Sequence, residues 1–498
     1  MSLYDRSSLI QVPSLYKDGT LVSTIPEDRS GDFTVVRGSN LSATRVGEDG
    51  YIKKGYENLL LQSNTFDTTW TTSNASLTGG QAGYDGSNDA WLLTRTGTFG
   101  QIIQNITNSG VQTFSIYAKA GTLNWIRLTQ GSPLAYFNLS GSGAVGTTSS
   151  NIDAAIESVG DGWFRCSMTS NTSLTNVKVY LVNGDNDLSG TTGTAYIQDA
   201  QVNQGLVAYP YLETTTAPAQ GGLLENSPRV DWSNGVPAVL VEPSRTNLLP
   251  YSEWIGGWDD VNDATIDGVQ SFTLGSTGAR IQAGSIGSPS GDFVFYAVFD
   301  STDVGKTIKL SYFDATAGGW NSGSEITIDS NGRAERLIST GSNVIGNVAF
   351  YGTSTSQSFT LKYCQFEDGS YPTSYIPTYG TSQTRSNEVI SDNFDIPTTA
   401  TIYNSFYSDT AETVFVLDQV FNVAEGLNKV AIAFSPTAVK ISVGGSIVAN
   451  ATGTYDTTAL SNIQLGSNNG TDYSNAPISG FYVFPEFLTD EELNSLTA

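Results

Sequence analysis

Short runs in which large hydrophobic residues alternate with smaller or polar ones dominate this chain of 498 residues. The alternation is clear over residues 177–181 and 430–434, and glycine, asparagine or aspartate bounds many such runs. A period of two is the pattern of a half-buried β-strand, because successive side chains point to opposite faces of a sheet. The pattern therefore predicts an all-β fold built from short strands.

The C-terminus has a helical pattern instead. Thr489 and Glu492 have the spacing of a capping box, in which each side chain accepts a hydrogen bond from the other residue's backbone N–H. Leu493 and Leu496 follow at helical spacing. We expect a short C-terminal helix that offers these two leucines to a partner.

The middle of the chain contains an internal repeat. The motif NLLLQSNTFDTTW begins at Asn58, and NLLPYSEWIGGW begins at Asn247. Further matched pairs follow in the same order in both copies: Ser63 with Ser252, Trp70 with Trp258, Tyr117 with Tyr296, Gln201 with Gln365, Gly205 with Gly369, Tyr211 with Tyr375, and Thr214 with Thr378. So many matches in one order are hard to obtain by chance, and they predict two homologous modules.

The repeat divides the chain into four parts. Residues 51–216 and 217–385 are predicted to be two homologous sandwich modules, and 386–498 a third sandwich. Residues 1–50 show little regular periodicity and form a separate N-terminal segment. In the last module, the glycine pair at 444–445 predicts a two-residue hairpin turn, because both positions tolerate positive φ.

Charge excludes two classes of partner. Charged residues are only 14% of the chain, and the net charge is −25. Binding to nucleic acid or to anionic membranes needs clustered Lys and Arg, and no basic cluster is longer than Lys53-Lys54. The longest apolar runs, such as 293–299, are too short to span a membrane, so no membrane insertion is expected. The N-terminus has no signal-peptide pattern, and we expect synthesis in a cytoplasm.

The residue types also argue against an enzyme. The chain has no histidine, which excludes Ser-His-Asp and Cys-His nucleophiles and histidine-ligated metals. Paired carboxylates remain, but no spacing singles out a pair among Glu225, Glu242, Glu253 and Glu367. The two cysteines, Cys166 and Cys364, lie far apart in strand-like runs and are expected to be buried free thiols.

Trp125 and Arg127 are the candidate ligand-binding residues, for a glycan. Strand alternation places Ile126 and Leu128 on the core face and therefore Trp125 and Arg127 on the opposite face. An indole offers an apolar plane to a sugar ring, and a guanidinium beside it can donate to hydroxyls. The alternative is that Trp125 packs under a loop or in a subunit interface, which is the commoner fate of tryptophan.

Asp185 and Asp187 are the candidate metal ligands. They lie in an Asp-rich turn, and Ca²⁺ prefers clustered oxygen ligands. The spacing does not fit an EF-hand, and Asn and Asp favour solvated turns in any case. Calcium is the only cofactor that the sequence suggests.

Several motifs between residues 31 and 378 resemble those of tailed-bacteriophage virion proteins. These motifs are GDFT at 31–34, SATRV at 42–46, VPAVLVEPSRTNLLPYSE at 236–253, and the two module endings at 201–215 and 365–378. The resembling group comprises head fibre, head spike and tail fibre proteins, whose repeated modules are similar to carbohydrate-binding jelly rolls. The resemblance therefore implies serial jelly-roll modules in a virion structural protein.

The last module resembles a concanavalin-like or laminin-G-like sandwich. The hairpin VAIAFSPTAVKISVGGSIVA and the closing segment 479–498 carry the resemblance. The chain departs from that family's pattern at two positions: Asn428 stands where the family usually has tryptophan, and Gly444 where it has asparagine.

These features predict a phage fibre or spike that projects from the capsid or tail, binds host glycans weakly, and is not an enzyme. One alternative is a tail receptor-binding protein that recognises host polysaccharide, and another is a carbohydrate-active depolymerase. A homotrimer is expected, because modular fibres commonly gain stability by cyclic association.

Residues 1–50 are predicted to attach the protein to the particle's capsid or tail proteins. This segment has apolar side chains without an obvious core of their own, so burial against a partner would explain them. They are Tyr4, Leu9, Ile10, Val12, Leu15 and Tyr16. On this hypothesis, a protein that lacks residues 1–30 should still fold.

Overall fold

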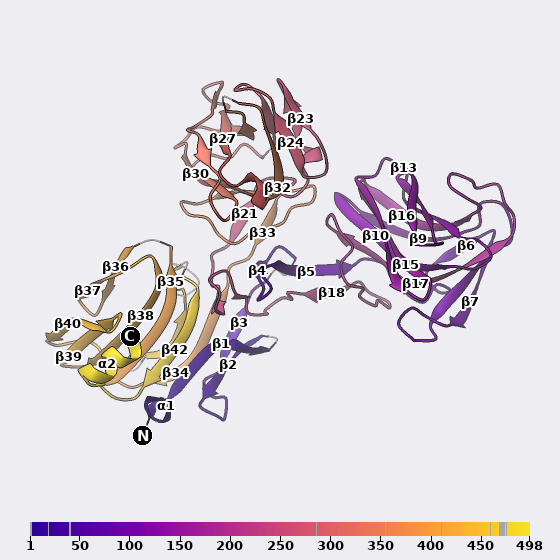
Figure 1. Cartoon of the computed structure of the whole chain (residues 1–498). Coiled ribbons are helices and arrows are strands. Elements are labelled where there is room, and N and C mark those ends of the chain that lie inside the picture. Colours follow the sequence, from indigo (N-terminus) through magenta and orange to yellow (C-terminus); the bar gives the residue numbers. More distant parts are fainter. Residues whose placement is uncertain are drawn as a thin grey trace.

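In the computed structural model the chain forms three β-sandwiches around a central junction (Figure 1). The structure describes residues 2–17, 19–38, 41–284, 286–353, 355–409, 411–458, 460–467, 474 and 476–498. Within these residues, α-helix is confined to α1 (Leu3–Arg6) and α2 (Asp490–Thr497), with single 3₁₀ turns at Ile255–Gly257 and Ser301–Asp303. The prediction of an all-β fold with sandwich modules and a C-terminal helix is confirmed.

Module 1 consists of two antiparallel sheets packed face to face. One sheet has the order β14 (Asp153–Gly160), β15 (Trp163–Asn171), β10 (Val111–Ala120), β17 (Gly193–Gln204), β8 (Ala90–Arg95), β7 (Ala75–Gln81). The other has the order β13 (Ala144–Ser149), β12 (Leu134–Asn138), β11 (Trp125–Gln130), β16 (Leu174–Val182), β9 (Gln101–Asn108), β6 (Thr71–Ser73). Side chains such as Phe114 and Leu128 fill the core between them.

Module 2 repeats this plan. One sheet contains β23 (Ala264–Ile266), β24 (Ser271–Leu274), β32 (Gln357–Asp368), β21 (Arg245–Asn247), β33 (Gln383–Arg385), β26 (Asp292–Phe299) and β30 (Arg333–Ser339). The other contains β22 (Asp259–Val261), β25 (Arg280–Gln282), β31 (Ile345–Tyr351), β27 (Thr307–Asp314), β28 (Gly319–Asn321) and β29 (Ile326–Thr327). Cys166 in module 1 and Cys364 here are buried free thiols, as predicted.

The repeated sequence motifs hold the two modules closed by equivalent hydrogen bonds. In module 1, Asn58 Nδ2 donates to the carbonyls of Ala200 and Leu212, at 3.1 and 2.8 Å. In module 2, Asn247 Nδ2 donates likewise to the carbonyls of Cys364 and Ile376, at 3.4 and 2.8 Å.

The repeated serine acts in the same way in both copies. Ser63 Oγ accepts from the Thr214 backbone N–H at 2.9 Å, and Ser252 Oγ accepts from that of Thr378 at 2.8 Å. These motif residues therefore join the first strand of each module to its last segment. They are framework residues.

The third sandwich takes strands from both ends of the chain. Its large sheet has the order β40 (Ser446–Thr452), β39 (Ala438–Val443), β38 (Gly426–Ser435), β35 (Ala400–Ser408), β42 (Ile478–Phe484), β1 (Leu9–Lys17), β2 (Thr20–Ile25), β3 (Phe33–Val36), β34 (Val389–Ile396), β41 (Leu460–Leu465). The short strands β19 (Val230–Asp231) and β20 (Ala238–Val239) join it at β42, and β36 (Glu412–Val416) and β37 (Gln419–Val423) form a separate hairpin.

The N-terminal segment therefore has strands and a core, contrary to expectation. β1 pairs with β42, so that Leu9 lies opposite Val483, and β3 pairs with β34. Leu9, Leu21 and Phe33 are buried with residues of the C-terminal strands. The segment lacked an apparent core because its partners lie more than 350 residues further along the chain.

Modules 1 and 2 each leave and rejoin the junction on paired strands. β5 (Ile52–Asn58), which leads into module 1, pairs with β18 (Ala219–Gly222), which leads out, and β4 (Thr44–Val46) completes this small sheet. In module 2, β21 and β33 pair in the same way, with Arg245 opposite Arg385. Both modules therefore project from the junction as large insertions.

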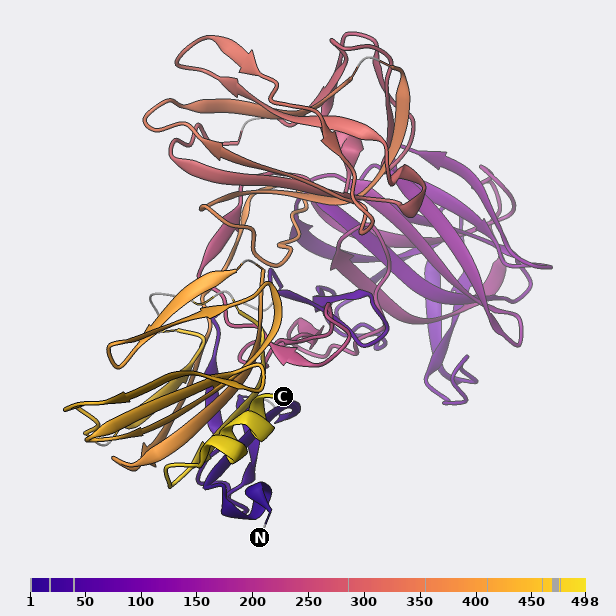
Figure 2. The ribbon, with the colours of Figure 1, turned by 60° about the vertical axis from the view of Figure 1, so that its left-hand side comes forward.

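The C-terminal helix packs on its own sandwich, near the N-terminus (Figure 2). Its capping box between Thr489 and Glu492 is present, as predicted. Leu493 is fully buried against residues of β35, β38 and β42, and Leu496 is half-buried beside it. The expectation that both leucines are offered to a partner is wrong, because the sandwich itself covers this face of the helix. The homotrimer stays a prediction without this support.

Candidate functional site

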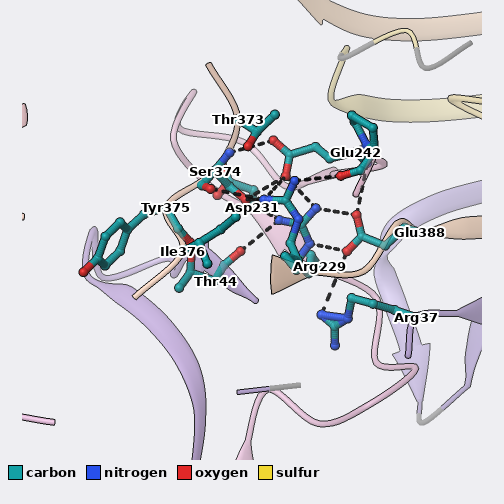
Figure 3. Close-up of polar contacts among 12 residues, drawn as sticks. Arg37, Thr44, Arg229, Asp231, Glu242, Thr373, Ser374, Tyr375, Ile376 and Glu388 are labelled. Carbon is teal, nitrogen blue, oxygen red and sulfur yellow. Dashed lines mark hydrogen bonds and ion pairs between the residues drawn. The ribbon is translucent and has the colours of Figure 1, made fainter. Parts of the chain in front are cut away.

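A cluster of buried charges lies where the three sandwiches meet (Figure 3). Arg229 lies between two carboxylates, and it contacts Glu242 at 2.7 Å and Glu388 through a paired contact. Arg385 contacts Glu242 at 3.1 Å, and Arg37 lies 3.9 Å from Glu388. We call these five residues the junction cluster.

Opposite charges decide the protonation state of the junction cluster. Burial alone would raise the pKa of Glu242, but Arg385 and Arg229 outweigh burial and lower it to about 2. Burial lowers the pKa of Arg37 to about 10, since Glu388 compensates only in part. Both groups therefore stay charged near neutral pH.

Three of the four glutamates considered as catalytic candidates serve the framework. Glu242 belongs to the junction cluster and also accepts from the Ser374 backbone N–H at 2.8 Å. Glu367 is fully buried and accepts from the Thr373 backbone N–H at 2.7 Å. Glu253 accepts from the Tyr375 hydroxyl at 2.9 Å. None of the three lines either of the two cavities described below.

Trp125 and Arg127 lie together on the outward face of the β11 sheet of module 1. Ile126 and Leu128 are fully buried in the core, so the predicted alternation is correct. The guanidinium of Arg127 lies 3.8 Å from the ring centroid of Tyr180, a distance typical of cation–π stacking. We call this surface the platform face.

The platform face is partly covered. Trp125 is half-buried, and Tyr136 and Tyr180 beside it are buried. Leu188, from the loop after β16, packs against the same aromatic group. The structure therefore combines the two alternatives for Trp125. A residue of the loop packs against its aromatic group, as in the packing alternative, and part of the indole stays accessible, as a glycan site requires.

Asp185 lies next to Trp125, which the sequence did not predict. A Cβ at Gly146 would come within 2.7 Å of the Trp125 ring and 2.5 Å of Asp185 Oδ1. The glycine thus permits the close approach of the indole at the start of β11 and a carboxylate from the turn after β16. Two separate candidates from the sequence, the Trp125–Arg127 pair and Asp185, share one surface.

Several polar atoms on the platform face have unused hydrogen-bonding capacity. Cross-strand pairing places Arg127 opposite Tyr180, and Tyr180 opposite Gln101, so their side chains share this face. Within the described part of the chain, the buried atoms without a hydrogen-bond partner on this face are Gln101 Oε1, Arg127 Nε, Thr129 Oγ1 and Asn176 Oδ1. Each such buried atom costs about 1–3 kcal/mol while it stays unpaired.

The two aspartates proposed as metal ligands accept hydrogen bonds from the protein itself, Asp185 from strand β13 and Asp187 from its own turn. Asp185 accepts from the Thr147 backbone N–H at 2.7 Å, and Asp187 accepts from that of Ser189 at 2.9 Å. The Ser189 hydrogen bonds lower the pKa of Asp187. Among the residues that the structure describes, no group of three or more His, Cys, Asp or Glu side chains could hold a metal ion.

The proposed attachment residues fall into two groups. Leu9 and Ile10 are buried in the third sandwich, and Val12 is half-buried. The exposed ones are Tyr4, Leu15 and Tyr16, at 56%, 42% and 41% exposure. Only this second group is free to contact another molecule.

A pocket between modules 1 and 2 is too small for a ligand. It is lined by residues that include Lys54, Tyr56 and Tyr379 and has a volume of about 30 Å³, which is room for about one water. The Lys54 ammonium lies 4.2 Å from the ring centroid of Tyr379 and 4.8 Å from that of Tyr209. These contacts join the two modules.

Fold and surface together define an all-β protein of jelly-roll-type sandwiches joined at a buried ionic junction. In the part of the chain that the structure describes, no helix is long and apolar enough to cross a membrane. No protein-family profile matches the chain, and no curated protein matches it.

Two solved structures are similar to parts of the chain. One is the M60 catalytic domain with the CBM51-1 and CBM51-2 domains from Clostridium perfringens ZmpB, at 10% identity and a TM-score of 0.16. The match covers 67% of this chain and 43%, less than half, of that one. The other is the pair of tandem CBM51 modules of Sp3GH98, the family 98 glycoside hydrolase from Streptococcus pneumoniae SP3-BS71. Its identity is 12% and its TM-score 0.16, over 68% of this chain and 93% of that one.

Proposed function

We propose that this protein is a structural component of a tailed-phage particle, a fibre or spike, that binds surface glycans through module 1 and catalyses no reaction. The motifs at 31–34, 42–46 and 236–253 support the virion role by their resemblance to phage head and tail fibre proteins. The architecture is compatible with it, because two modules project from one junction.

The observation that carries the glycan-binding proposal is the chemistry of the platform face. Sugars have apolar ring faces and hydroxyls that both donate and accept, so their sites combine aromatic rings with convergent polar groups. The platform face has the half-buried indole of Trp125, the stacked guanidinium of Arg127 and the adjacent carboxylate of Asp185.

Replacement of Trp125 tests this site. We expect Trp125→Ala to weaken binding to an array of bacterial surface polysaccharides about fivefold, because one aromatic contact contributes on the order of 1 kcal/mol. Trp320→Ala is the matched control, since Trp320 is half-buried on the corresponding sheet of module 2 and stacks with Arg280 at 5.1 Å. Equal binding losses in both variants, or a loss in neither, would contradict the proposal.

The location of the protein on the particle tests the virion role. Gold-labelled antibodies against module 1 should decorate intact phage particles in electron micrographs at fixed positions. Labels on the capsid would indicate a head fibre or spike, and labels at the tail tip would favour a receptor-binding protein. Unlabelled particles from a lysate that contains the protein would contradict a structural role.

A further inference from the structure

A second surface feature, a groove, lies between the N-terminal strands and the junction. Its volume is about 560 Å³, which is in the range of ligand-binding clefts. Three separate parts of the chain line it: the end of β1, the β4–β5 hairpin, and the start of the segment that follows module 1. The lining residues are Ser14, Tyr16, Arg45, Gly47, Glu48, Asp49, Lys53, Val230 and Trp232.

Aromatic rings contribute the apolar part of this groove. Tyr16 is 41% exposed, and Trp232 is half-buried. The backbone N–H of Trp232 donates to the Val46 carbonyl at 3.1 Å, which holds this residue against the hairpin. Val230 is the only aliphatic lining residue with a branched side chain, and it is only 2% exposed. The groove therefore offers ring faces and very little aliphatic surface.

Arg45 has an unused donor in this groove. Its Nη1 donates to the Val230 carbonyl at 2.7 Å, and its Nη2 donates to the Tyr16 hydroxyl at 3.2 Å. Its Nε is buried and has no partner among the residues that the structure describes. The two bonds fix the guanidinium beside the Tyr16 ring, 5.8 Å from its centroid, and leave further N–H groups without a bond to the protein.

The charges of the groove balance. Arg45 and Lys53 are positive, and Glu48 and Asp49 are negative. Lys53 and Asp49 contact each other at 2.5 Å, with about half of each side chain exposed. A net charge of zero, in a chain whose net charge is −25, does not favour an anionic ligand.

We propose that this groove is a binding site for a short, neutral oligosaccharide. Tyr16 and Trp232 would stack on the sugar rings, the carboxylates of Glu48 and Asp49 would accept from hydroxyls, and the Arg45 guanidinium would donate to one. A protein partner is disfavoured, because stable protein interfaces have an apolar core that this groove lacks. The site shares no residue with the platform face, so either proposal can fail alone.

Fluorine NMR of the full-length protein labelled with 5-fluorotryptophan tests the groove. The chain has eight tryptophans, and Trp232→Phe and Trp125→Phe assign the two resonances that report on the groove and the platform face. The probes are maltotriose, triacetylchitotriose and the anionic 3′-sialyllactose at millimolar concentrations. We expect at least one neutral trisaccharide to shift the Trp232 resonance saturably, and more strongly than 3′-sialyllactose does.

Two variants define the site further. Tyr16→Ala, at an exposed position, should weaken the neutral sugar about fivefold, and Glu48→Gln should weaken it without a change in side-chain shape. Trp320→Ala is the control and should bind as the unaltered protein does. The proposal is overturned if neither neutral sugar shifts the Trp232 resonance, if 3′-sialyllactose binds more tightly, or if Tyr16→Ala leaves the response unchanged. A shift of the Trp125 resonance alone would support the platform face and reject the groove.

Discussion

Removal of residues 1–30 is expected to unfold the third sandwich while modules 1 and 2 stay folded. β1 and β2 lie inside the large sheet, between β42 and β3, so their loss removes three strand pairings and exposes the edge of β42. It also removes Leu9 and Leu21, both fully buried, and each contributes about 1.5–3 kcal/mol by burial. Together these losses are a large part of the 5–15 kcal/mol by which a typical domain is stable.

Differential scanning calorimetry of the truncated and full-length proteins measures this effect. The truncated protein should lack the transition of the third sandwich and should aggregate, because a free β42 edge can pair with other chains. A protein that lacks only residues 1–5 is the control, since α1 has no buried residues and Arg6 is retained. If the 1–30 truncation keeps every transition of the full-length protein, the N-terminal strands do not belong to this core.

Replacement of Arg229 by methionine is expected to destabilise the junction by about 3–5 kcal/mol. The guanidinium is completely buried between Glu242 and Glu388, and its removal leaves two buried carboxylates undercompensated. Arg229 Nη1 also donates to the Thr44 carbonyl in β4 at 3.1 Å. The loss of the guanidinium therefore also affects the small sheet of β4, β5 and β18 from which module 1 projects. Urea unfolding at neutral pH measures the free-energy change.

Two further variants interpret the Arg229→Met result. Arg229→Met combined with Glu388→Gln should recover part of the loss, because the second change removes one of the unpaired charges. Lys440→Met is the surface control, since its ion pair with Asp490 lies at the surface, with the two side chains 25% and 53% exposed, and should be worth less than about 1 kcal/mol. A loss in Arg229→Met no greater than in Lys440→Met would show that the junction cluster contributes little.

The junction cluster should lose stability as the pH falls, because the pKa of Glu242 is lowered in the folded protein. Because the folded-state pKa of Glu242 is lowered to about 2 from its ordinary 4.5, its contribution to stability is full above the ordinary value. This contribution is lost as the pH falls toward 2. The Arg229→Met variant should therefore lose less stability than the unaltered protein over this acid range.

The repeat could be recognised in the sequence because the same residue types recur in the same order in both modules. The roles of Asn58 and Asn247 could not be read from it, since the carbonyls that they bind lie more than 115 residues further along the chain. From the sequence alone, these two side-chain amides could equally have contacted a ligand. The fold shows that they donate to backbone carbonyls instead. The same holds for Glu242, whose neighbours Ser374 and Arg385 lie more than 130 residues further along the chain.

The sequence by itself determined the properties that depend on neighbours along the chain. These include the strand period, the Thr489–Glu492 capping box, the turn at 444–445 with positive φ at both glycines, and the opposite faces of Ile126 and Trp125. Only the tertiary structure decided which strands pair, that residues 9–36 complete the third sandwich, and which atoms stay unpaired on the platform face and in the groove. The physical reason is that alternation specifies which side chains share one face of a strand. What covers that face depends on contacts between residues that are remote in sequence, such as Leu9 and Val483.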